Sequence, residues 1–181
     1  MRLFPEGKSK PLSAAALACA GVSLALAVKA LLDLATILSL FSAPAVYLSL
    51  ARSTVPYGMP PLAALLTTHI RAFFAFAFLF WTSACVLACG VWLRREWARR
   101  GAVWMLYLVS AAALLVVFYP WLAVPRPLLL DGADVFPEFN AAVRSAAFFA
   151  RLLALLGGAL SLWWALALER SGLRSEFVRA A

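Results

Sequence analysis

Charged side chains inside or at the edges of long apolar runs are the residues of this sequence best suited to bind or move charge. Lys29 and Asp33 lie four positions apart, so on a helix they share one face and can pair. His69 and Arg71 interrupt the start of a second run, and Arg151 lies inside a later one. Ionisable residues within a membrane span are costly and often functional. These five are the candidate functional charges. One hypothesis is a charged outer vestibule. The alternative is a set of interfacial residues whose polar ends reach water.

Cysteine, histidine and acidic residues do not form a known redox or metal pattern. Cys85 and Cys89 lie one helical turn apart, whereas redox cysteines use a C-x-x-C spacing, so packing is favoured. His69 is the only histidine, which excludes multi-histidine ligation within the chain. Asp131 and Asp134 lack the 12-residue pattern of a calcium loop. There is also no phosphate-binding glycine loop or hydrolase motif. We expect no catalytic residues, no cofactor and no metal.

A basic segment with one tryptophan separates the second and third apolar runs. It reads Arg94-Arg95-Glu96-Trp97-Ala98-Arg99-Arg100. Clustered arginines beside a membrane span attract anionic lipid headgroups or an acidic protein surface. The segment is therefore a candidate cytoplasmic docking site, and its docking residues are Arg94, Arg95, Trp97, Arg99 and Arg100.

Small residues recur at helical spacing in the first and last apolar runs. In lipid, such residues let helices approach closely, and packing replaces the hydrophobic drive. They predict helix–helix contacts within the chain or with a partner. The residues are Ala15, Cys19, Ser23, Ala27, Ala154, Gly157, Gly158 and Ser161.

The composition indicates an integral membrane protein. The 181 residues are 65% hydrophobic and 13% charged, whereas soluble domains are roughly half apolar and a quarter charged. A soluble fold of this size could not bury so much apolar surface. The net charge of +8 lies mainly beside apolar runs and forms no basic stripe with exposed aromatics, which argues against nucleic acid.

The apolar runs predict four transmembrane helices in one membrane domain covering 1–181. The expected spans are 12–41, 72–93, 102–122 and 146–168. Outer loops are expected at 43–71 and 123–145, with a helical outer extension over 62–71, and an inner turn at 94–101. The first run is too long for a cleaved signal peptide, and at roughly 45 Å it exceeds the hydrocarbon core of about 30 Å.

Basic residues near the span ends predict the orientation. One side carries ten of the 16 basic residues, and the other carries six. The positive-inside rule makes the richer side cytoplasmic. We therefore expect an all-α, four-transmembrane-helix antiparallel bundle with both termini inside, in a bacterial cytoplasmic membrane. The ten are Arg2, Lys8, Lys10, Arg94, Arg95, Arg99, Arg100, Arg170, Arg174 and Arg179.

Three functions fit these patterns. The leading hypothesis is a non-enzymatic membrane subunit or accessory protein that packs with partner membrane proteins or with itself. The second is a small homo-oligomeric channel or transporter with the charged outer vestibule. The third is an interfacial enzyme acting on a lipid or quinone near His69. The expected partners are the lipid bilayer, including anionic lipids, and other membrane subunits or further copies of the chain.

Overall fold

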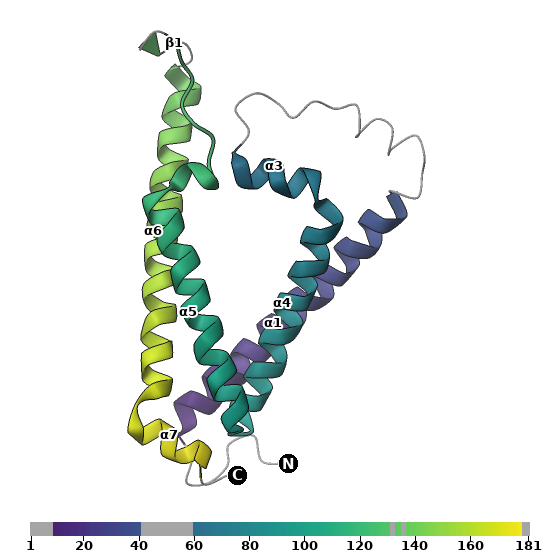
Figure 1. Ribbon diagram of the computed structural model, residues 1–181, viewed down its shortest axis with the longest axis vertical. Coiled ribbons are helices and arrows are strands. Elements are labelled where there is room, and N and C mark those ends of the chain that lie inside the picture. The colour runs from purple at the N-terminus through teal and green to yellow at the C-terminus, as the bar shows by residue number, and fades with distance from the viewer. Residues whose placement is uncertain (1–8, 41–59, 131–132, 135–136, 179–181) are drawn as a thin grey trace. The chain divides into compact units, whose positions relative to one another are not determined.

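The structure is a computed structural model that describes residues 9–40, 60–130, 133–134 and 137–178 (Figure 1). Over these ranges the chain is mainly helical, with short non-helical connections and one short hairpin. Four helices are long and apolar enough to span a membrane: α1 (Lys10–Leu40), α4 (Ile70–Trp92), α5 (Glu96–Phe118) and α6 (Pro137–Glu169). Two shorter helices, α3 (Pro61–Thr68) and α7 (Ser171–Val178), accompany them. The prediction of an all-α fold with four candidate spans is confirmed.

Large apolar side chains remain exposed along all four long helices. Trp104 on α5 is 71% exposed and Leu153 on α6 is 69% exposed. Water would penalise such a surface, whereas lipid is a good solvent for it. A helix also satisfies its own backbone hydrogen bonds, as a segment crossing lipid must. The described helices are thus those of a membrane protein.

The chain divides into two compact units. Unit 1 contains α1, α4, the first half of α5, the end of α6 and α7. Its core is formed where α4 turns into α5, beside the start of α1 and the end of α6 (Figure 1). Five helices contribute to this core, through Leu12, Ala16, Val91, Ala98, Val103, Leu168 and Phe177.

The α4–α5 hairpin of unit 1 is tightly packed because a glycine faces it. A Cβ built on Gly90 would clash with the Cβ of Ala98, and would lie 3.3 Å from the Trp97 ring. Gly90 therefore permits an approach of the two helices that a larger residue would prevent.

The buried face of α1 follows the true helical repeat. Its buried residues are Leu12, Ser13, Ala16, Ser23, Ala27 and Ala30, which span an arc of about 100° when each residue advances by about 100°. The small residues predicted to pack recur every four positions, and each such step turns by about 40° around the helix axis. They therefore do not all lie on the buried face. Ser23 and Ala27 are buried as that prediction requires, Ala15 is half-buried and Cys19 is exposed.

Unit 2 contains α3, the second half of α5 and most of α6. Ser110 Oγ donates a 3.1 Å hydrogen bond to the carbonyl oxygen of Gly158. A Cβ on Gly158 would lie 2.8 Å from the Cβ of Ala113, so this glycine permits close α5–α6 packing. Ala154 and Ser161 lie half-buried one turn before and after it, whereas Gly157 is exposed.

The connection from α5 to α6 is anchored by a buried asparagine. Pro120 begins a short 3₁₀ helix, η1 (Pro120–Leu122), directly after α5. Farther on, Asn140 Oδ1 accepts from the Leu128 N–H at 2.8 Å, and Asn140 Nδ2 donates to the Leu128 carbonyl at 2.9 Å. Strands β1 (Leu129–Leu130) and β2 (Ala133–Asp134) then pair antiparallel, and η1 packs against α3.

Several helix boundaries differ from the expected spans. Residues 96–101 belong to α5 rather than to the inner turn, which shortens to 93–95, because Glu96 suits the positive end of a helix. Residues 137–145 belong to α6 rather than to the outer loop, with Pro137 at a position that favours proline. Apolarity locates the membrane part of a helix, whereas capping and turn residues determine where the helix ends.

Part of the expected first outer loop is also helical. The outer extension 62–71 forms α3 and the start of α4, with a break at His69, whose φ of −118° and ψ of 40° are not helical. Residues 43–59 of this loop, together with Arg52, lie outside the described residues.

Candidate functional site

The α4–α5 turn places an arginine in a backbone conformation that normally belongs to glycine. Arg94 has a φ of 60°, in the left-handed region where a Cβ is unfavourable. The Arg94 N–H donates to the Val91 carbonyl at 3.0 Å, and the Arg95 N–H donates to the Gly90 carbonyl at 2.9 Å. This pair of bonds is the Schellman pattern that closes a helix end. Because glycine would adopt this φ without strain, we expect the contacts of the arginine side chain to offset the strain.

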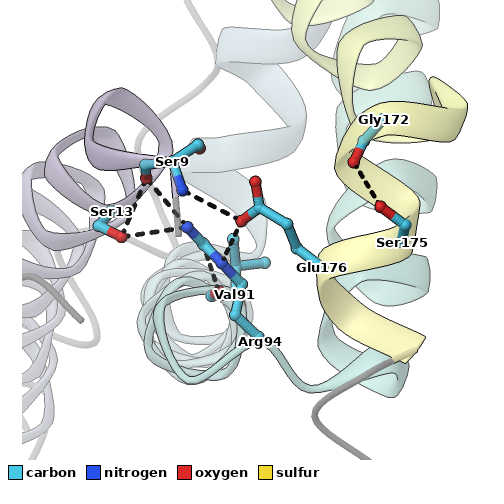
Figure 2. A network of polar contacts seen from close by, with 7 residues as sticks. All are labelled: Ser9, Ser13, Val91, Arg94, Gly172, Ser175 and Glu176. Carbon is cyan, nitrogen blue, oxygen red and sulfur yellow. Dashed lines mark hydrogen bonds and ion pairs between the residues drawn. The ribbon is translucent and has the colours of Figure 1, made fainter. Parts of the chain in front are cut away.

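The Arg94 side chain is fully buried and joins three separate segments. Its Nη1 donates to the Val91 carbonyl at 3.2 Å. Its Nη2 donates to the Ser9 carbonyl and to Ser13 Oγ, each at 3.1 Å. The start of α1 is thereby held against the α4–α5 turn, as Figure 2 shows. We call Ser9, Ser13, Arg94 and Glu176 the Arg94 cluster.

Glu176 of α7 supplies the negative charge of this cluster. Its Oε2 lies 3.0 Å from Arg94 Nε and accepts the backbone N–H of Ser9 at 3.3 Å (Figure 2). The guanidinium carbon also lies 5.7 Å from the centre of the buried Phe177 ring, within the range of a cation–π interaction. Burial lowers the pKa of the Arg94 guanidinium, and the Glu176 carboxylate opposes this by favouring the charged form.

A second arginine ties α5 to the end of α6. Arg99 Nε and Nη2 donate to the two carboxylate oxygens of Glu96, at 2.8 and 2.7 Å. Arg99 Nη1 donates to the Leu168 carbonyl at 3.2 Å, in the last turn of α6, where unpaired carbonyls attract a cation. Nearby, Tyr107 Oη donates to Glu169 at 3.0 Å. The paired donors of Arg94 and Arg99 give these two residues a structural role.

The predicted docking segment therefore contains residues in two different environments. Arg94 and Arg99 are buried and bonded within the chain, so neither is presented to a partner. Arg95, Trp97 and Arg100 are exposed, and Arg100 Nε also lies 3.0 Å from Glu96. The docking hypothesis now rests on these three exposed residues.

Lys29 and Arg71 lie far along their helices from this end. Lys29 is 16 residues beyond Ser13 on α1, about 24 Å. Arg71 is 20 residues from Val91 on α4, about 30 Å. The intervening segments carry no Asp, Glu, Lys, Arg or His, and their length matches a hydrocarbon core of about 30 Å.

Of the five candidate charges, the structure pairs Lys29 with Asp33. Lys29 Nζ lies 2.6 Å from Asp33 Oδ2, and both side chains are substantially exposed. His69 is exposed after α3, and its N–H donates to the Leu65 carbonyl at 2.9 Å. Arg71 and Arg151 are also exposed. A vestibule built from all five remains a prediction.

The remaining candidates carry no cofactor geometry. Cys85 is half-buried and Cys89 is exposed, and the described cysteines are free thiols. No group of three metal-ligating side chains occurs among the residues that the structure describes. Asp131 lies outside those residues.

Sequence reasoning missed most members of the Arg94 cluster. Ser9 and Ser13 sit in an unremarkable helix start, and Glu176 and Phe177 sit in a polar tail. A sequence signal for α7 does exist, because Phe177 is an isolated aromatic residue among polar neighbours. It does not identify Arg94 as the partner.

No protein-family model, curated protein or solved structure matches the chain. Its class is therefore defined by the fold and the site. It is a polytopic α-helical integral membrane protein, and buried arginines join its helices at one end.

Proposed function

We propose that this protein is a non-enzymatic membrane subunit that binds a transmembrane helix of a partner protein, or of another copy, through α1. The proposal places both termini in the cytoplasm of a bacterial inner membrane, in keeping with the excess of basic residues on that side. It rests on one observation: α1 has a second face of small residues, and that face is exposed.

The exposed face lies opposite the buried one. Ala14, Ala18, Gly21 and Ala25 are all exposed and fall within about 60° of one another at about 100° per residue. The centre of this arc is about 160° from the centre of the buried face. A Cβ built on Gly21 would meet nothing within 4 Å. One face of α1 thus packs inside the chain while the other is open.

The residue types of this outward face favour a helix over lipid as its neighbour. A side facing only lipid gains nothing from four small residues, whereas a second helix can approach closely there. Larger exposed residues, Val22 on one side and Leu24 and Val28 on the other, border the face. A ridge of side chains on a second helix can fit between these larger residues.

Two double variants test the proposal. Ala18→Leu with Ala25→Leu fills the outward face, whereas Val22→Leu with Val28→Leu changes residues that are already large. The chain is extracted in mild detergent at its native level, and the mass of the intact particle is measured. We expect wild type and the valine control to leave the membrane in a particle larger than the 19.6 kDa chain. The variant with Ala18→Leu and Ala25→Leu should emerge as the single chain.

Each outcome has a definite meaning. A fixed ratio of different proteins indicates a heteromeric subunit, and a defined multiple of the chain indicates self-association. A wild-type protein that is extracted alone, or an alanine variant that keeps the full particle, contradicts the proposal.

The position of the Lys29–Asp33 pair favours a channel as the second candidate. Lys29 lies about 50° from the centre of the outward face and is exposed. Self-association through this face would bring several such pairs together at the outer ends of α1. Ion flux in liposomes that is unchanged by Asp33→Asn would remove the case for this pair, and an absence of flux with the wild-type protein would exclude the candidate.

A further inference from the structure

We infer that the inner end of unit 1 is a binding surface for anionic phospholipid headgroups, with Arg95, Arg170 and Arg174 as the residues that contact phosphate. This inference concerns lipid and holds whether or not α1 binds a protein partner. It follows from which charges at this end are paired within the chain and which are not.

Among the described residues, the carboxylates of this end are all engaged inside the chain. Glu176 faces Arg94, Glu96 holds Arg99 and Arg100, and Glu169 accepts from Tyr107. The cations served by Glu176 and Glu96 include the two buried arginines. These acidic residues thus stabilise the fold and are not available to pair with the other exposed cations at this end.

Apart from Arg100, which pairs with Glu96, the described residues include four exposed cations at this end: Lys10, Arg95, Arg170 and Arg174. Among the described residues, none of the four side chains has an ion-pair partner. Each lies within two positions of a residue that joins the helices here, namely Ser9, Arg94, Glu169 or Glu176. Contacts at the Arg94 cluster and at the end of α6 therefore hold the four near one end of the unit.

Exposed aromatic residues beside these cations indicate lipid rather than an acidic protein. Trp97, Arg100 and Trp104 lie on one face of α5 at spacings of three and four residues, and all three are exposed. Tryptophan concentrates at the headgroup level of a bilayer. Trp104 continues into the charge-free part of α5, so this face passes from polar to apolar surroundings, as a lipid contact requires.

The experiment compares two matched triple variants. The inner variant is Arg95→Gln, Arg170→Gln and Arg174→Gln. The control is Arg126→Gln, Arg144→Gln and Arg151→Gln, which removes the same charge from exposed arginines of the 123–151 region. Each full-length protein is placed in nanodiscs of equal parts phosphatidylglycerol and phosphatidylcholine. Native mass spectrometry then gives the ratio of the two lipids retained.

Wild type and the control should retain phosphatidylglycerol preferentially, and added salt should weaken the preference. A basic residue near an anionic surface changes affinity on the order of fivefold, so three together change it on the order of a hundredfold. The inner variant should therefore lose most of the preference.

Three results would overturn the inference. They are equal retention of both lipids by wild type, an unchanged preference in the inner variant, or an equal loss in the control. Co-purification of an acidic protein without phosphatidylglycerol enrichment would assign the surface to protein instead. If the inner variant misfolds, as judged by its circular dichroism, the single variants Arg95→Gln, Arg170→Gln and Arg174→Gln decide the question: each should lower the preference about fivefold, and an unchanged preference in all three would overturn the inference.

Discussion

Neutralising Glu176 is the most informative test of the Arg94 cluster. Glu176→Gln keeps the size of the side chain and an oxygen that can accept the Ser9 N–H, but it removes the charge opposite Arg94. The guanidinium is fully buried and would lose its only carboxylate within ion-pair distance among the described residues. We expect α7 to detach more easily, because Glu176 joins it to the cluster while Phe177 and Leu173 are its contacts with the core.

The magnitude follows from the burial of the two partners. Removing one member of a fully buried ion pair costs about 3–5 kcal/mol. The Glu176 side chain is 20% exposed, so water screens it in part and about 2 kcal/mol is the appropriate value. This corresponds to a roughly 30-fold increase in the opening equilibrium of α7.

Amide hydrogen exchange of the protein in nanodiscs measures this opening directly. Exchange over residues 171–178 should accelerate roughly 30-fold in Glu176→Gln. Ser175→Ala is the control, because Ser175 is an exposed residue of the same helix and should change stability by less than about 0.5 kcal/mol. Equal exchange rates in the two variants would refute the assignment of Glu176 as the charge that holds α7.

Three further predictions follow from close contacts elsewhere. Gly90→Ala should lower the free energy of unfolding in detergent by about 1–3 kcal/mol because its Cβ has no room, whereas Gly157→Ala, with open space, should be neutral or stabilising by up to about 1 kcal/mol. Arg99→Gln should lower the thermal midpoint more than Arg100→Gln, since both share Glu96 but only Arg99 also binds the end of α6; similar midpoints would contradict this. Arg94→Gly should be more stable than Arg94→Ala by about 1 kcal/mol in the same unfolding assay, because only glycine accepts a positive φ without strain.

The membrane helices could be predicted because they depend on local composition. The charge-free segments 72–93 and 152–168 are long enough to cross the bilayer, and no distant residue is needed to identify them. The predicted helix ends were less accurate than the predicted spans. Residues 96–101 and 137–145 are polar enough to resemble loops but favourable enough to continue a helix.

The Arg94 cluster could not be predicted because its contacts are distant in sequence. Arg94 meets Ser13 across 81 positions and Ser9 across 85. From sequence, Arg94 and Arg95 are equivalent members of a basic turn. The structure separates them through the backbone, because the left-handed φ of Arg94 closes α4 while its side chain enters the core.

The two faces of α1 connect this cluster to the proposed function. Bonds from Arg94 to Ser9 and Ser13 act on the first turn of α1, and they help to fix the rotation of the helix about its axis. That rotation determines that Ala18 and Gly21, one to two turns later, face outward. Arg94→Ala should therefore disturb association through α1 as well as fold stability. Glu176→Gln leaves the donors of Arg94 to α1 in place, so it should loosen α7 while association persists. A cluster that served stability alone would not separate the two variants in this way.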